Sequence, residues 1–184
     1  MALALLKDTA TLPRALATPT DHVRVLTGSS TAAEFLSLLV AAFDHTIHVG
    51  LRAPDVQPNA EQVAFFLLHR LSHEPVEVLY GLFFNGNGSL IHDRELARGS
   101  LSACLSTPSE IARTALALGA SAVVLAHNHP SGSSNPSACD IHFSAEVAAS
   151  LALADAALID HLIVAGGITV SMRRLGCLPK TTAL

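Results

Sequence analysis

The chain has 184 residues, of which 50% are apolar and only 14% are charged. A chain of this length and composition can bury a substantial core, which excludes extensive disorder. The formal net charge is −4 at pH 7, so the chain lacks the basic excess that is typical of proteins binding duplex nucleic acid.

Membrane insertion and secretion are not indicated either. The mean hydropathy is +0.44, but no uninterrupted apolar stretch reaches the roughly 20 residues of a spanning helix. The apolar run at 1–6 has no basic residue before it and is a poor signal peptide. The three cysteines are widely spaced, which indicates neither a disulfide framework nor a CxxC zinc site. We therefore expect a cytoplasmic protein with no membrane partner.

The first part of the chain predicts little regular structure. Residues 1–29 are mixed Ala, Leu, Thr and Pro without a sustained period, and we interpret them as a loosely structured lead-in. A helix is predicted from Thr31, because Thr31 and Glu34 have the spacing of a capping box. Residues 50–58 contain one glycine and two prolines, which favours a linker. These features predict a partly helical N-terminal extension at 1–58.

Residues 59–184 predict a compact domain in which strands and helices alternate. Branched and aromatic residues, turn signals and helix caps place the elements. Helices are predicted at 59–71, from Thr107 to a stop at Gly119, and at 138–154; strands are predicted at 76–84, 89–98 (as one or two), 121–126, 158–164 and 168–172. Such alternation indicates an α/β or α+β sandwich.

One stretch carries residues suited to metal chemistry. His127 and His129 lie two apart at the end of the strand predicted at 121–126, and side chains two apart on a strand leave on the same face. Ser137 and Asp140 follow at the start of the next predicted helix, which the intervening loop can bring back beside the strand end. Two histidines and one carboxylate form a three-ligand set that leaves the fourth position of zinc open for water.

A structural explanation of the same residues must be weighed against the metal site. Ser137 and Asp140 also have the spacing of a capping box, and the histidines could be ordinary polar residues where a strand meets solvent. Capping does not explain the paired histidines. The full His-x-His-x7-Ser-x2-Asp array has a chance probability of roughly a few in a thousand, so we favour the metal site.

The array and its flanking sequence resemble the RadC branch of the JAB/MPN metalloprotease domain family, whose signature is called the JAMM motif. The matching segments are RGSL at 98–101, the stretch 108–119, VVLAHNHPSG at 123–132, PS at 136–137, DI at 140–141 and DHLIV at 160–164. Together they cover about residues 60–175 of the chain. The resemblance implies an α/β/α sandwich with a mixed β-sheet flanked by helices, preceded here by a short helical extension.

The resemblance also implies roles for individual residues. In the JAB family the two histidines and the aspartate bind Zn2+, which assigns His127, His129 and Asp140 as metal ligands. The serine of the motif stabilises the oxyanion, which assigns Ser137, and a glutamate before an early strand acts as general base, which assigns Glu77. The competing carboxylates are Glu74 and Glu95. We expect a structural role for His161, and we expect His142 to project from its helix away from the metal.

The function that the resemblance implies is a zinc-dependent hydrolase of the metallopeptidase or isopeptidase class. Its substrate would be a peptide or an isopeptide-linked protein, and a zinc-activated water would attack the amide carbonyl. The alternative is a non-catalytic module in DNA repair, recombination or protein assembly. The region up to Gln62 lacks the Gly-rich helix-hairpin-helix of RadC-like proteins and is not basic, so the charge does not support DNA as a partner. The sequence leaves homo-oligomerisation open.

Overall fold

The computed structural model describes residues 20–52, 57–72, 74–99 and 107–179, which fall into two compact units, Met1–Gly50 and Leu51–Leu184. The first unit contains helix α3 (Thr20–Thr27) and most of helix α4 (Ser30–Arg52). The predicted lead-in is therefore wrong for residues 20–27, where one buried side chain, Val23, gives the short helix little periodicity. Residues 1–19 of that lead-in lie outside the described residues.

Helix α4 begins and ends differently from the prediction. Its start is capped by Ser29, whose hydroxyl accepts a hydrogen bond from the backbone N–H of Ala32 at 3.2 Å, and not by a box starting at Thr31. The helix continues to Arg52, so the first residues of the predicted linker are helical. Residues 53–56 of that linker lie outside the described residues.

A five-stranded mixed sheet forms the centre of the second unit. Its strands are β1 (Val78–Phe84), β2 (Leu90–Arg98), β3 (Ala122–Asn128), β4 (Ala157–Ala165) and β5 (Ile168–Ser171), in the order β2-β1-β3-β4-β5. Strands β3 and β4 are parallel, and the other neighbours are antiparallel. All seven residues of β1 are buried, as expected for a strand inside the sheet.

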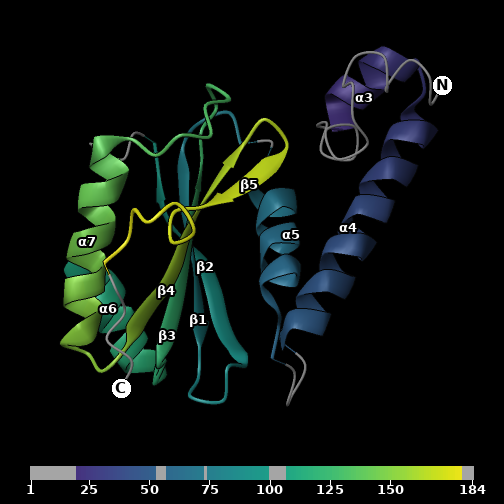
Figure 1. The fold of residues 1–184 in the computed structure, drawn as a ribbon. Coiled ribbons are helices and arrows are strands. Elements are labelled where there is room, and N and C mark those ends of the chain that lie inside the picture. Colours follow the sequence, from purple (N-terminus) through teal and green to yellow (C-terminus); the bar gives the residue numbers. More distant parts are fainter. Residues whose placement is uncertain (1–19, 53–56, 73, 100–106, 180–184) are drawn as a thin grey trace. The chain divides into compact units, whose positions relative to one another are not determined.

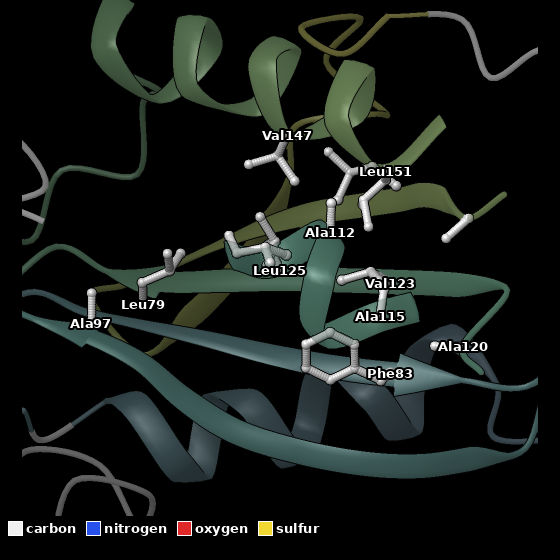
Figure 2. Close-up of a cluster of buried hydrophobic side chains, with 13 residues drawn as sticks. Leu79, Phe83, Ala97, Ala112, Ala115, Ala120, Val123, Leu125, Val147 and Leu151 are labelled. Carbon is white, nitrogen blue, oxygen red and sulfur yellow. The ribbon is translucent and has the colours of Figure 1, made fainter. Parts of the chain in front are cut away.

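Helices cover both faces of this sheet (Figure 1). Helices α6 (Pro108–Leu118) and α7 (Ala138–Ala152) pack on one face, and α5 (Ala60–Leu71) packs on the other. Figure 2 shows the core under α6 and α7, where Phe83 and Leu125 of the sheet meet Ala115, Val147 and Leu151 of the helices. The predicted α/β/α sandwich with a mixed sheet is confirmed.

Local signals in the sequence set most of the helix ends. Capping boxes start α5 at Asn59, α6 at Thr107 and α7 at Ser137, and α6 stops at Gly119, which has a left-handed conformation with φ of 64°. Strand β3, predicted to end at residue 126, runs on to Asn128. Among the helices that the structure describes, none combines the length and apolar character that a bilayer crossing requires.

Candidate metal centre

The two histidines of the array lie at the carboxyl end of β3. His127 is the second-last residue of the strand and its side chain is fully buried, while His129 follows directly after the strand and is 10% exposed. Their Nε2 atoms lie 2.9 Å apart. The prediction that both imidazoles leave on one face and converge is confirmed.

The third member of the cluster comes from the first turn of α7. The Oδ1 atom of Asp140 lies 3.2 Å from Nε2 of His127, and its Oδ2 atom lies 3.6 Å from Nε2 of His129. One ligand atom from each of the three residues fits within a spread of 4.8 Å. The loop at 129–137 thus returns the helix start to the strand end, and these three side chains could hold a metal ion.

Hydrogen bonds orient the cluster for metal binding. Nδ1 of His129 lies 2.7 Å from the carbonyl oxygen of Ser133, which can only accept, so Nδ1 carries the proton and Nε2 has a free lone pair. Burial alone would raise the pKa of Asp140. The hydrogen bond and charge of His127, together with the Ser137 hydroxyl and N–H, instead hold that pKa well below its usual value. Asp140 is therefore a carboxylate at neutral pH.

This donor set suits a zinc ion. Two imidazole nitrogens and one ionised carboxylate oxygen are common ligands of catalytic zinc, and three protein ligands leave one tetrahedral position for a water or substrate atom. Each ligand also has the second hydrogen bond that usually orients a metal-binding side chain. The residues present therefore fit the metal that the resemblance implies.

Comparison with known proteins gives the family. A family profile described as "RadC-like JAB domain" matches residues 57–177. The chain belongs to the RadC-like JAB domain family. A UPF0758 protein of Bordetella avium is 39% identical over 146 residues, covering 78% of this chain and 65% of that relative. A UPF0758 protein of Bordetella parapertussis is 38% identical over 162 residues, covering 88% of this chain and 72% of that relative.

In this RadC-like domain the segment that carries Glu77 is anchored beside the metal ligands. The side chain of Asn128, between the two histidines, donates to the carbonyl oxygens of Glu74 (3.1 Å) and Val76 (2.9 Å). Its Oδ1 atom accepts from the backbone N–H of Val78 at 2.7 Å. The Glu77 side chain is half-buried, and its role as general base stays a prediction.

The competing carboxylates are engaged elsewhere. The Arg98 guanidinium bridges them, with Nη1 at 2.5 Å from Glu74 and Nη2 at 2.7 Å from Glu95. These hydrogen bonds raise the pKa of Arg98 further above its usual value. Both carboxylates are occupied by this ion pair, which counts against Glu74 and Glu95 as the general base.

Ser137 makes the capping box that was weighed against the metal site. Its hydroxyl oxygen accepts from the backbone N–H of Asp140 at 3.1 Å, and the Asp140 carboxylate accepts from the N–H of Ser137 at 2.7 Å. The two interpretations of these residues are therefore compatible. A capping hydroxyl still has a proton to donate, so the predicted oxyanion role of Ser137 is chemically open.

Sequence analysis missed the residues behind the ligands. Asn128 was not assigned a role, and neither the Ser133 carbonyl nor Ser144, which contacts His161, carries any signal in the sequence. His161 was noticed as part of the DHLIV match, and it proves to be fully buried against His127. The imidazole of His142 is 78% exposed on α7 and pairs with Glu146.

Proposed function

We propose that this RadC-like JAB domain is a zinc-dependent hydrolase of the metallopeptidase class, acting on an amide bond in a peptide or an isopeptide-linked protein. The observation that carries the proposal is the buried convergence of His127, His129 and Asp140 at the end of β3. Its three ligand atoms leave a coordination position for the reacting group, which is how catalytic zinc sites differ from structural ones.

The residues around the cluster supply the remaining chemistry. A bound zinc ion would lower the pKa of a water molecule and polarise the amide carbonyl. The Glu77 carboxylate accepts the proton that this water loses as its oxygen bonds to the carbonyl carbon. The Ser137 hydroxyl donates to the carbonyl oxygen as negative charge develops there. The C–N bond then breaks, and Glu77 returns the proton to the leaving amine.

The proposal is tested by measuring metal content and hydrolysis in the same set of variants. We expect about one zinc ion per chain in the purified protein and none in His129→Ala or Asp140→Ala. His142→Ala is the matched control, because it removes an exposed histidine outside the cluster and should retain the metal. The substrate probes are a library of quenched fluorescent peptides and a pair of peptides joined through a lysine side chain.

The Glu77→Gln variant separates metal binding from turnover. We expect this variant to retain zinc and to lose about 100-fold or more in turnover, because the amide cannot accept the proton. A fully active Glu77→Gln protein would refute its assignment as the base. Zinc bound without hydrolysis of either probe would favour the alternative, a non-catalytic module in DNA repair, recombination or protein assembly.

A further inference from the structure

A buried chain of hydrogen bonds lies behind His127, on the side away from Asp140 and His129. Nδ1 of His127 is 2.8 Å from Nε2 of His161, and Nδ1 of His161 is 2.7 Å from the hydroxyl of Ser144. That hydroxyl lies 2.6 Å from the backbone carbonyl oxygen of Asp140. The side chains come from β3, β4 and α7, and all three of these residues have 0% exposure.

The chain has a direction because its last member can only accept. The Asp140 carbonyl has no proton, so the Ser144 hydroxyl must donate to it. The Ser144 oxygen then accepts from Nδ1–H of His161, which leaves the Nε2 lone pair of a neutral His161 to accept from Nδ1–H of His127. The other nitrogen of His127, Nε2, faces Asp140 and His129 and is thereby the one left for a metal ion.

The burial of His161 favours the neutral ring that this direction requires. His161 is completely buried, and a charged imidazolium there would lose its hydration. A charged His161 would have a proton on Nε2 and would force the proton of His127 onto its own Nε2, where a metal must bind. The neutral form avoids that conflict.

We propose that His161 and Ser144 are positioning residues that fix His127 in the Nδ1–H tautomer and so present its Nε2 lone pair to a metal ion. The chain starts at one ligand and ends on the backbone of another, Asp140, so it also ties the end of β3 to the start of α7 through β4. This inference rests on the proposed metal site, but not on hydrolysis of any substrate.

A purely structural role for His161 predicts something different. If the ring only fills space, an apolar side chain such as leucine could replace it without changing the tautomer of His127. If the ring positions His127, leucine removes the acceptor of the Nδ1 proton, whereas glutamine can still present an amide oxygen to His127 and an N–H to Ser144. Rescue by glutamine is therefore the signature of positioning.

The first measurement needs no metal. Long-range ¹H–¹⁵N spectra of the imidazoles in the metal-free protein distinguish the Nδ1–H from the Nε2–H tautomer. We expect a proton on Nδ1 of His127 in the wild type and in His161→Gln, and loss of that Nδ1 proton in His161→Leu. Ser144→Ala leaves the His161 ring intact and should shift the His127 tautomer partly. If His161→Leu does not fold, Ser144→Ala still tests the proposal. His142→Gln is the matched control, because His142 is an exposed histidine of α7 outside the cluster, and it should change nothing.

The second measurement is zinc affinity, determined by competition with a chromophoric chelator. We expect His161→Leu to bind zinc about 10- to 100-fold more weakly than the wild type, which is the usual cost of losing an outer-shell partner, and His161→Gln to recover most of the loss. Equal tautomers in the wild type, His161→Leu and Ser144→Ala, or equal losses for leucine and glutamine, would overturn the proposal. Zinc binding that depends on His161 in a protein without hydrolase activity would refute the proposed function and leave the positioning role standing.

Discussion

Ser137 combines two roles in one hydroxyl group, and substitution can separate them. The oxygen caps α7 by accepting from the backbone N–H of Asp140, and the proton is proposed to stabilise the oxyanion. Thr107 makes the same capping box at the start of α6, where no metal ligand follows it. The two caps therefore form a matched pair.

We expect Ser137→Ala and Thr107→Ala to lower the free energy of unfolding by similar amounts, about 1 kcal/mol each. Only Ser137→Ala should also lower turnover, by about 100-fold, because it alone removes a donor to the developing oxyanion. Denaturant unfolding and hydrolysis of the peptide probes measure the two effects. Equal turnover in the two variants would show that Ser137 acts only as a helix cap.

At the residue scale, the sequence identifies the ligands but not what orients them. His127, His129 and Asp140 follow from local spacing, because a strand and a helix cap determine where their side chains point. His161 is 34 residues from His127, so their contact depends on the pairing of β4 with β3. This pairing places Ile163 directly beside His127. His161 lies two residues before Ile163 on β4 and therefore on the same face of the sheet. No local pattern encodes such a pairing.

At the scale of elements, Asn128 joins β3 to the segment before β1. Its side-chain amide makes three hydrogen bonds to backbone groups, at Glu74 and Val76 of that segment and at Val78, the first residue of β1, and it is only 3% exposed. The segment contains Glu77, so the buried Asn128 amide holds the predicted general base at the same end of the sheet as the metal ligands. An alanine here would leave three backbone groups without these partners.

We expect Asn128→Ala to lower the free energy of unfolding by about 2 kcal/mol or more, because a buried polar group without a partner costs about 1–3 kcal/mol. Asn87→Ala is the control, since Asn87 is an exposed residue of the β1–β2 turn and should change stability by less than about 0.5 kcal/mol. Chemical denaturation of both variants measures the difference. An unchanged free energy of unfolding in Asn128→Ala would show that water replaces the amide and that its three hydrogen bonds do not stabilise the fold.

Element ends were predictable where one residue type determines them. The capping boxes at Thr107 and Ser137 and the glycine at 119 lie where the sequence placed them, since each satisfies the orphan backbone groups of a helix end locally. The start of α4 was misplaced because Ser29 and Thr31 are both competent caps, and only the backbone conformation selects between them. Helix α3 was missed because a single buried side chain leaves no apolar stripe.

At the scale of the whole second unit, the packed layers bury a tyrosine whose ionisation reports on unfolding. Tyr80, in the interior strand β1, is the only tyrosine of a chain without tryptophan. Its hydroxyl donates to Asp93 at 2.6 Å, and the Arg70 guanidinium lies 5.5 Å from the ring centre. Burial, followed by the hydrogen bond and charge of Asp93, raises the pKa of Tyr80 well above its usual 10.0, although Arg70 opposes this.

The raised pKa links stability to alkaline pH. Above pH 10 the unfolded chain loses the Tyr80 proton while the folded chain keeps it, so the unfolded state binds fewer protons and the free energy of unfolding falls as pH rises. The contribution approaches about 1.4 kcal/mol per pH unit for one such group. Below pH 10 both states keep the proton, and this group contributes no slope.

A single absorbance experiment tests this linkage. Because Tyr80 is the only tyrosine, the near-ultraviolet absorbance of tyrosinate measures its ionisation directly, and circular dichroism measures unfolding in the same samples. We expect the two transitions to coincide, since the phenolate forms only when the sheet opens. Tyr80→Phe removes the titrating group, so its free energy of unfolding should fall less steeply above pH 10 than that of the wild type. The opposite outcome would be tyrosinate that forms near pH 10 while the circular dichroism stays native. It would mean that solvent reaches Tyr80 in the folded sheet and that the hydrogen bond to Asp93 does not keep the Tyr80 hydroxyl protonated.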